Sequence, residues 1–245
     1  MQKDVYQNMY AGQDTFWWHR GMRKFFGVFL EKYVRSTNNI ILDIGCGTGA
    51  LFPVLKKYGT VYGLDISEEA VLYAKKTGIA KEVKQGNAST IPYGADIFDV
   101  VVCSDLLYHA NVEDDKAVLI EIRRVLKKGG LLVIKEASYD WLRSRMDELV
   151  QTKHRYTRSE LKGKIETANF EIVRATYMMT FLFPAALISR LIERVIPRSY
   201  GASELFISNS IINILFTSIL YFEASLIRWL NFPFGLSIMS VARRK

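Results

Sequence analysis

The sequence predicts an α/β fold, in which helices cover both faces of a doubly wound, mostly parallel sheet of seven strands. First, an apolar strand at residues 40–44 runs directly into a glycine-rich turn at 45–49 and then into a helical pattern. Second, apolar strand segments alternate with helical segments as far as residue 136, which is typical of parallel sheets with crossover helices. Third, 245 residues with 49% hydrophobic side chains can bury one substantial core and an appendage.

Composition indicates the cellular compartment and the kinds of partner that the protein has. Two cysteines, Cys46 in the turn and Cys103 in an apolar strand, are too few for a disulfide framework, which favours a reducing compartment. The first residues lack the apolar stretch of a secretory signal, so we expect a cytoplasmic protein. The net charge of +8 is spread along the chain. It could reflect contact with an anionic surface, but basic residues on a face exposed to water explain it equally well.

The glycine-rich turn is the predicted ligand site. Gly45, Gly47 and Gly49 remove Cβ from three alternate positions, so backbone amides can approach a ligand closely and the turn can use positive φ without strain. A helix is expected at residues 50–58, and its N-terminal amides would point to the same place.

Two classes of cofactor use such a turn. Gly45, Gly47 and Ala50 satisfy the dinucleotide fingerprint, and Asp65 lies about 20 residues on, where that fingerprint expects a ribose carboxylate. Asp43 distinguishes the classes, because an acid two residues before the first glycine would repel a pyrophosphate. S-adenosylmethionine instead carries a sulfonium and an ammonium group, which a carboxylate attracts.

Residues 42–49, Leu-Asp-Ile-Gly-Cys-Gly-Thr-Gly, resemble the first motif of the class I S-adenosylmethionine-dependent methyltransferases. Residues 127–134 resemble the same class, which implies a Rossmann-like sheet whose last two strands pair antiparallel at one edge. We therefore expect six parallel strands and one antiparallel edge strand. The resemblance implies an enzyme that uses S-adenosylmethionine, with Asn87 near the adenine where relatives usually carry Asp. The predicted cofactor-binding residues are Trp18, Arg23, Asp43, Gly45, Cys46, Gly47, Gly49, Asp65, Ile66, Asn87, Ala88 and Ser104.

A helix is predicted at residues 16–35, with Asp14 or Thr15 as its N-cap. Its first residues, 16–23, resemble a Trp-Trp and Arg cluster of a methyltransferase subgroup linked to polysaccharide or lipid-linked glycan pathways. That resemblance implies that Arg23 pairs with the methionine carboxylate and that Trp18 walls the pocket. An aromatic core helix with solvated arginines is an equally good interpretation.

Three residues are candidates for catalysis. His109 follows the apolar strand 100–103, at the carboxyl end where ligands bind in open parallel sheets, so it could orient an acceptor, take its proton, or only pack beside the cofactor. His154 and Tyr156 belong to a stretch similar to one that faces the acceptor in the same subgroup, although a solvated helix start explains it equally well. The histidines share no metal-ligand spacing, so no metal is predicted.

The remaining elements follow from periodicity and capping signals. Thr157 and Glu160 predict a capping box for a helix at 158–168. Further strands are expected at 59–65, 82–85, 100–103, 131–135, 170–178 and 235–242, and further helices at 67–76, 114–126 and 139–150. Residues 1–178 and 233–245 would form the catalytic domain with its N-terminal cap helix, and residues 179–232 an apolar helical insertion.

The insertion has several interpretations. An amphipathic helix is expected around residues 187–195, whereas the polar residues of 205–222 argue against a membrane span. The insertion could be a lid, a homodimer interface, or an apolar mouth that rests on a membrane, with Arg190, Arg194, Arg198 and Arg228 meeting anionic headgroups.

The predicted function is methyl transfer to an oxygen or nitrogen of a small-molecule or lipid-linked sugar acceptor. An RNA or protein methyltransferase is favoured only by charge, since no recognition module is present, and DNA is not an expected partner. A non-catalytic cofactor-binding scaffold is the third alternative.

Overall fold

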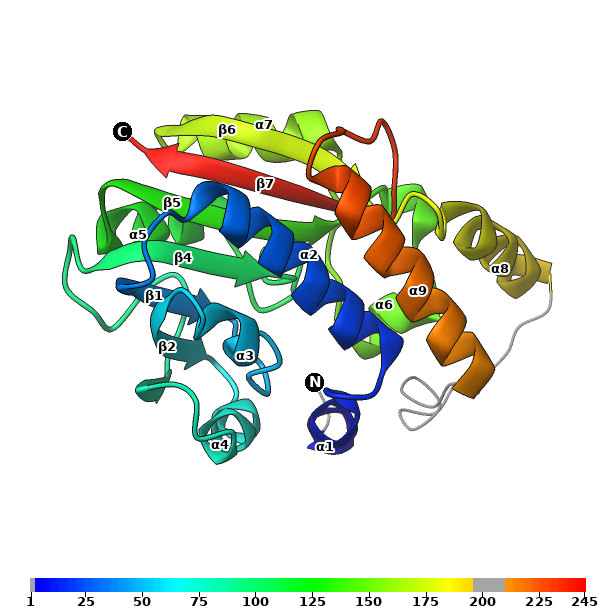
Figure 1. Ribbon diagram of the computed structural model, residues 1–245, viewed down its shortest axis with the longest axis horizontal. Helices are drawn as coiled ribbons and strands as arrows, with labels where there is room; N and C mark the ends of the chain where they lie inside the picture. Colours follow the sequence, from blue (N-terminus) through cyan, green and yellow to red (C-terminus); the bar gives the residue numbers. More distant parts are fainter. Residues whose placement is uncertain (1–2, 196–209) are drawn as a thin grey trace.

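The computed structural model describes residues 3–195 and 210–245. Its centre is a seven-stranded sheet with the order β3-β2-β1-β4-β5-β7-β6 (Figure 1). The strands are β1 (Asn39–Ile44), β2 (Gly59–Asp65), β3 (Glu82–Gln85), β4 (Phe98–Ser104), β5 (Leu126–Ala137), β6 (Phe170–Met178) and β7 (Ser237–Arg244). The predicted doubly wound α/β fold is confirmed.

The position of the antiparallel strand differs from the prediction. Strand β7 runs antiparallel to both β5 and β6, so it lies between them and β6 forms the edge of the sheet. The expected antiparallel pair is present, but the antiparallel strand is not the edge strand. Long-range contacts determine the order of two strands at one end of a sheet, and the sequence of either strand carries no local signal for it.

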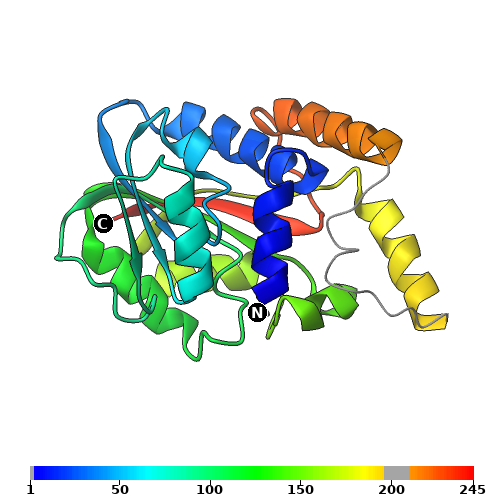
Figure 2. The same cartoon turned by 90° about the horizontal axis from the view of Figure 1, so that it is seen from below.

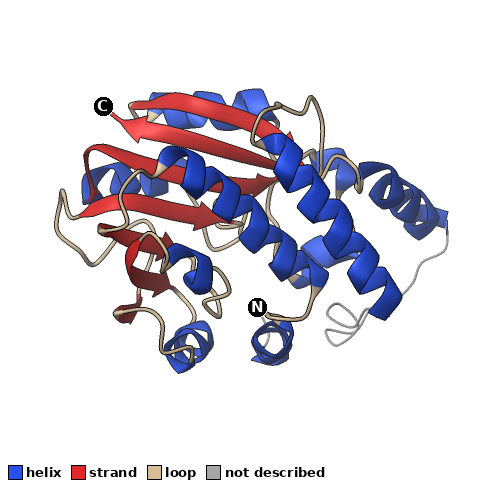
Figure 3. Cartoon of the chain, viewed as in Figure 1, coloured by secondary structure: helices blue, strands red, loops and turns tan. Residues whose placement is uncertain are grey.

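Helices form a layer on each face of the sheet. Helices α2 and α9 lie along one face, and α5 and α7 cover the other, as two perpendicular views show (Figures 1 and 2). Figure 3 separates the helices from the strands by colour. The helices are α1 (Lys3–Gly12), α2 (Trp17–Tyr33), α3 (Phe52–Leu55), α4 (Glu68–Lys76), α5 (Asp115–Val125), α6 (Arg145–Leu149), α7 (Arg158–Thr167), α8 (Phe183–Val195) and α9 (Ser210–Ile227).

Capping explains where several helices begin. The Thr157 side chain accepts from Glu160 N, and the Glu160 side chain reaches back to Thr157 N, so the predicted capping box is confirmed. The predicted caps of α2 are wrong: its N-cap is Phe16, which makes no side-chain cap hydrogen bond.

Three segments depart from the expected pattern. Helix α1 was not predicted, and the helix expected at 50–58 is only the four residues of α3. The helix expected at 139–150 is a 3-10 turn at Asp140–Leu142 followed by α6, which restarts where Ser144 and Asp147 form a capping box. Strand β5 begins at Leu126 instead of Leu131, directly after α5, so residues 127–130, which the prediction left between a helix and a strand, belong to the strand.

Helix α9 is bound to α2 along one side. The Trp17 ring meets the Phe216 ring edge-on at 5.2 Å, and Trp17 N donates to Asn213 Oδ1 at 2.7 Å. Near the other end, buried Glu223 accepts from Thr180 N and Phe181 N, both at 3.0 Å.

Among the described helices, α9 is long and apolar enough to cross a membrane by length and composition alone. In the structure, 28% of its residues are buried inside the protein. Its polar contacts with α2 and with the residues after β6 favour a helix packed on the domain over a membrane span.

Candidate functional site

A cavity of about 420 Å³ opens at the carboxyl ends of β1, β2 and β4. This is where open parallel sheets bind ligands. The predicted site residues that line it are Trp18, Asp43, Gly45, Cys46, Gly47, Asp65, Ile66, Asn87, Ala88, Ser104 and His109. Segments far apart in the chain therefore meet at the place that the turn motif indicated.

The glycine-rich turn forms the floor of the cavity. Gly45, Gly47 and Gly49 have φ of 70°, 52° and 82°. In this backbone conformation residues other than glycine are strained. A Cβ at Gly47 would meet nothing within 4 Å, so a ligand can approach the backbone there. Gly49 lies behind the lining, where a Cβ would come within 2.7 Å of the Phe52 ring.

Asp65 connects the end of β2 to the turn. Its Oδ2 accepts from Gly47 N at 2.8 Å and its Oδ1 from Ser67 N at 2.9 Å. Burial raises the pKa of this carboxyl group, and the two backbone N–H groups oppose that rise. The carboxylate is thus held at the cavity with lone pairs remaining, and binding of the ribose hydroxyls stays a prediction.

Asp43 has an unsatisfied polar atom at the cavity floor. Only 2% of its surface is exposed, and its Oδ2 has no hydrogen-bond partner. Burial, together with the nearby charge of Asp65, raises the pKa of Asp43 to about 8. A buried carboxyl oxygen without a partner is costly, and a ligand that brings positive charge to this point would favour the ionised form of Asp43.

The charges of the residues that line the cavity indicate which cofactor fits. Three carboxylates, Asp43, Asp65 and Asp105, face the cavity, and the described lining residues include no lysine or arginine. A pyrophosphate would meet acidic side chains and no cationic one among these lining residues, whereas a ligand with a sulfonium and an ammonium group would be attracted. The residues fit S-adenosylmethionine.

Two N-terminal helices form the outer wall. Trp18, His19 and Met22 come from α2, and Tyr6 and Met9 come from the unpredicted α1. Burial, with a further contribution from the charge of Arg23, lowers the pKa of His19 to about 4, so its imidazole is neutral at pH 7.

Arg23 does not line the cavity. Its Nη1 lies 3.4 Å from Asp14 Oδ1 and donates to Gln13 O at 2.6 Å. The guanidinium group therefore ties the α1–α2 connection together, and this placement gives no support to the expected pairing with the methionine carboxylate.

Asn87 and Ala88 lie beside Ile66 on the side expected to receive the adenine. The Asn87 Oδ1 accepts from Ser89 N at 2.9 Å, which fixes the amide by an Asx turn. Its Nδ2 hydrogens are not used in that turn. Asn87 can therefore offer donors as well as its second carbonyl lone pair, and its role at the adenine stays a prediction.

His109 lies at the cavity in a defined tautomer. Asn111 N donates to His109 Nδ1 at 3.2 Å, so Nδ1 carries the lone pair and a neutral ring has its proton on Nε2. Burial lowers the pKa of this histidine, which favours the neutral form. In this arrangement His109 supplies a hydrogen-bond donor through Nε2 and holds no free lone pair for a proton.

Sequence reasoning missed an ion pair beside the same cavity. Lys135, only 1% exposed at the end of β5, bonds Asp105 Oδ1 at 2.7 Å and Oδ2 at 2.6 Å. Asp105 itself lines the cavity. A lysine directly after the apolar run Leu131–Ile134 was the available signal, because a charge adjoining a buried strand requires a partner.

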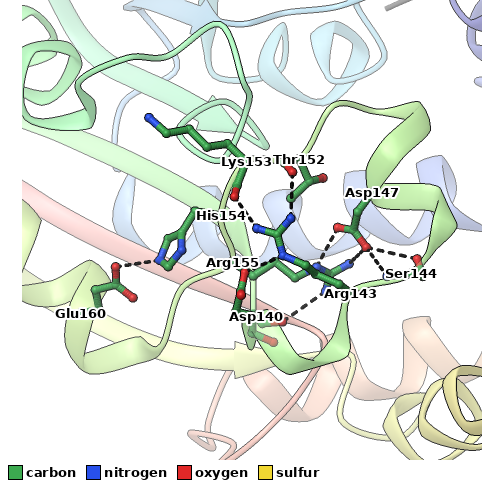
Figure 4. A network of polar contacts seen from close by, with 10 residues as sticks. Asp140, Arg143, Ser144, Asp147, Thr152, Lys153, His154, Arg155 and Glu160 are labelled. Atoms are coloured by element: carbon green, nitrogen blue, oxygen red, sulfur yellow. Dashed lines mark hydrogen bonds and ion pairs between the residues drawn. The ribbon is translucent and has the colours of Figure 1, made fainter. Parts of the chain in front are cut away.

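The other two catalytic candidates are not at the cavity. His154 Nε2 lies 2.8 Å from Glu160 Oε1 (Figure 4), and the buried Tyr156 hydroxyl bonds Leu107 O at 3.2 Å and Asp115 Oδ2 at 3.1 Å. Neither residue lines the cavity. The backbone of His154 donates to Tyr108 O, next to His109, but the side chains of His154 and Tyr156 do not join His109 at the cavity.

The segment around His154 is a closed polar network (Figure 4). Arg155 donates to both oxygens of Asp147, at 2.8 and 3.1 Å, and Asp147 Oδ2 also accepts from Ser144 N. Arg143 bonds Asp140 Oδ1 at 2.7 Å and the carbonyl oxygen of Lys153. These charges satisfy one another, so the network stabilises the connection from β5 to α7.

Known proteins show the same fold and family signature. Residues 42–134 match the family described as "Methyltransferase domain". An uncharacterized protein of Methanocaldococcus jannaschii is 29% identical over 185 residues, which are 73% of this chain and 78% of that protein. A demethylmenaquinone methyltransferase of Shouchella clausii is 34% identical over 152 residues, which are 55% of this chain and 62% of that enzyme.

Two solved structures extend the comparison. A chain of the Haloferax volcanii complex that contains the Trm112 methyltransferase activator superposes with a TM-score of 0.64 at 18% identity, covering 98% of this chain and 94% of that one. The geranyl diphosphate C-methyltransferase of Streptomyces coelicolor, solved with S-adenosylhomocysteine, gives 0.58 at 14% identity, covering 90% and 78%. At these identities the structures show a shared fold.

Proposed function

Given that this chain is a class I S-adenosylmethionine-dependent methyltransferase, we propose that it methylates a lipid-like acceptor, such as a lipid-linked sugar, held at a membrane surface. Its cofactor is S-adenosylmethionine, which the cavity described above would hold between Asp43 and Asp65. The bound cofactor supplies an electrophilic methyl group. The chain's own part is then to position an oxygen or nitrogen nucleophile and to exclude water.

The observation that carries this proposal is the exposed apolar surface of α8 and α9. On α9, Ile214 is 63% exposed and Phe222 60%, and just beyond it Trp229 is 78% exposed. We call the following residues the α8–α9 apolar surface: Phe181, Ile188, Leu191, Ile192, Ile211, Ile214, Leu215, Phe222, Trp229 and Leu230. The Phe181 and Phe222 rings meet at 5.8 Å, which joins the start of α8 to α9.

Basic groups accompany this surface. Lys24 lies 5.8 Å from the Tyr221 ring, and Lys32 Nζ donates to Arg228 O at 2.7 Å. The Arg228 guanidinium lies 5.7 Å from the Trp229 ring and pairs with the exposed Glu31 at 3.1 Å. Apolar side chains with flanking cations and an exposed tryptophan are typical of surfaces that rest on anionic membranes. Of the other arginines predicted to meet headgroups, Arg190 pairs with Glu193 at 3.0 Å, whereas the side chain of Arg194 and the whole of Arg198 lie outside the described part of the structure.

This surface adjoins the cavity through α2. Trp17 packs on Phe216 of α9, and the next residue, Trp18, lines the cavity. A molecule anchored in a membrane beside α9 would thus need only a short reach to the methyl-transfer site. The relative named demethylmenaquinone methyltransferase acts, by its name, on a quinone, which supports a lipid-like acceptor for this chain.

Vesicle binding tests the surface. We expect co-sedimentation with phosphatidylglycerol vesicles at low salt and weaker binding at high salt, because screening reduces the contribution of the basic groups. Phe222→Glu combined with Trp229→Glu should weaken binding by about tenfold or more, since each charge must enter the apolar interface. Ile120→Glu is the matched control, because Ile120 is 49% exposed on α5, on the opposite face of the sheet.

Labelling identifies the acceptor class. Incubation with methyl-labelled S-adenosylmethionine and fractionated cell extract should place the label in the lipid fraction. Label confined to RNA or protein would overturn the acceptor proposed here and favour the alternative class. A stable dimer that binds no vesicles at either salt concentration would reassign the α8–α9 apolar surface to dimerisation.

A further inference from the structure

Asp105 occupies a conformation that requires support. Its φ of 58° is in the left-handed region, where an aspartate is tolerated at some cost. Asp105 N donates to Lys135 O at 2.8 Å, and the Lys135 ammonium bonds both carboxylate oxygens. Strands β4 and β5 run parallel with Ser104 opposite Lys135, so this pair is built into the sheet.

The segment after Asp105 is fixed by a second carboxyl group. Fully buried Glu136 accepts from Leu107 N at 2.9 Å, from Leu106 N at 3.3 Å and, through its other oxygen, from Tyr108 N at 3.3 Å. This holds the turn between Asp105 and His109 in one geometry. Rigid placement of two cavity-lining polar groups is a feature of catalytic sites.

Lys135 also contacts the outer wall of the cavity. Its ammonium lies 4.6 Å from the centroid of the Trp18 ring, which lines the cavity on the α2 side. The cation is therefore enclosed between a carboxylate and an aromatic face and has almost no access to water. Its two hydrogen bonds hold the carboxylate of the neighbouring Asp105 in one orientation.

The three acids of the lining occupy different places. Asp65 is bonded to the glycine turn, and Asp43 lies beneath it at the end of β1. Asp105 lies at the end of β4, on the segment that carries His109, and 24% of its side chain is exposed. Of these carboxylates it is the one placed beside the expected acceptor.

We propose that Asp105 is the catalytic residue that takes the proton of an acceptor hydroxyl, while His109 donates a hydrogen bond from Nε2 to the acceptor oxygen. This deepens the proposed function, on which it rests, by naming a hydroxyl as the nucleophile. A lone pair of the oxygen forms the new O–CH₃ bond, and the sulfur–methyl bond breaks with its electron pair going to sulfur. The O–H proton passes to Asp105 Oδ. Even an ion-paired carboxylate is basic enough, because an alkylated hydroxyl is a strong acid.

Lys135 is a positioning residue in this scheme. Its two hydrogen bonds, with a third from Ser104 Oγ to Asp105 Oδ2 at 3.3 Å, fix the carboxylate of Asp105, which lines the cavity. The assignment also explains why His109 need not act as a base, since its only free ring position carries a proton.

Binding of two cofactor analogues tests Asp105 without any acceptor. Sinefungin carries an amino group where S-adenosylmethionine carries its methyl group, whereas S-adenosylhomocysteine carries nothing there. Calorimetry should show that Asp105→Asn weakens sinefungin binding on the order of ten- to hundredfold, because the ammonium loses a charged partner. The affinity for S-adenosylhomocysteine should stay within about threefold.

Two further proteins complete the experiment. Asp105→Asn combined with Lys135→Met removes both charges, which leaves no unpaired buried ammonium, and thermal melting would show that it folds. It should bind sinefungin as weakly as the single variant. Asp140→Asn, which alters an exposed ion pair with Arg143, should leave both affinities unchanged.

Equal losses for both analogues would overturn the proposal, because Asp105 would then hold the amino-acid end of the cofactor or only support the fold. Unchanged sinefungin binding would overturn it too. Labelling of a lipid extract provides the second readout, and Asp105→Asn should lower the rate about a hundredfold or more. Should the parent protein label no lipid, the membrane acceptor fails, while the analogue comparison still decides the position of Asp105.

Discussion

Single residues at the cavity floor set the proton balance of cofactor binding. Burial keeps Asp43 largely protonated at pH 7 in the ligand-free protein, with its pKa at about 8. A bound sulfonium or ammonium group would favour the carboxylate, so binding should expel a proton. We expect calorimetry at pH 7 in buffers of different ionisation enthalpy to detect most of one proton released to the buffer.

Asp43→Asn supplies the matched comparison, because it keeps the shape and removes the titration. The released proton should disappear in this variant, while the amino group of the cofactor contributes equally in both proteins. The pKa of Asp43 is raised above its ordinary 3.8, so the ligand-free protein should lose stability relative to Asp43→Asn as pH rises from about 4 toward 8. Equal proton release in the two proteins would contradict the assignment.

Residues within one motif could be predicted, and residues that pair across the sheet could not. Asp43, the glycines and Asp65 are close in sequence or at a known spacing, and all but Gly49 reach the cavity lining. Asp105 and Lys135 are 30 positions apart and meet only because β4 and β5 are neighbours. Arg23 was assigned to the cofactor by resemblance alone, whereas its partners Gln13 and Asp14 lie in the connection to α1, a helix that was not predicted.

At the scale of elements, the packing of α9 on α2 depends on one glycine. A Cβ at Gly21 would lie 2.2 Å from Leu220 Cδ1, whereas at Gly27 it would meet only Val54 Cγ2 at 3.4 Å. Gly21→Ala should destabilise the protein by about 1 to 3 kcal/mol, because α9 must move or repack. Gly27→Ala should stabilise it by up to about 1 kcal/mol, since alanine favours a helix interior.

Thermal unfolding separates these two glycines. For a chain of this size each kcal/mol shifts the melting temperature by about 2 to 4 °C, so the variants should move in opposite directions. A Gly21→Ala protein as stable as the parent would show that α9 does not rest on α2 as described.

Elements with strong local signals matched expectation, and elements defined by long-range contacts did not. Strand β6 has the predicted bounds, and the predicted capping box starts α7. The antiparallel pair was predicted correctly, but β7 is not the expected edge strand, because both β5 and β6 offered an edge with which it could pair. Helix α3 is short because Pro53 stands at its start and Gly59 already belongs to β2, so few residues remain for it.

At the scale of the whole molecule, the cofactor and the membrane would bind to different parts of the protein. The cavity draws on α1, α2 and the ends of β1, β2 and β4, whereas the α8–α9 apolar surface lies on helices placed between β6 and β7. A lid would instead join the two parts, because it must close over the cofactor. Hydrogen exchange distinguishes these arrangements.

We expect S-adenosylhomocysteine to slow amide exchange in α1, in residues 45–51 and in residues 104–112, because ligand binding suppresses the openings that expose those amides. Exchange in α8 should not change.

Phosphatidylglycerol vesicles should give the reverse pattern, with protection of α8 and of the exposed side of α9 and little effect on residues 45–51. Protection of α8 by S-adenosylhomocysteine in solution would identify the insertion as a lid, and protection of α8 that rises with protein concentration would identify a dimer interface. Neither result is compatible with a surface reserved for the membrane, so the single measurement separates all three uses of this insertion.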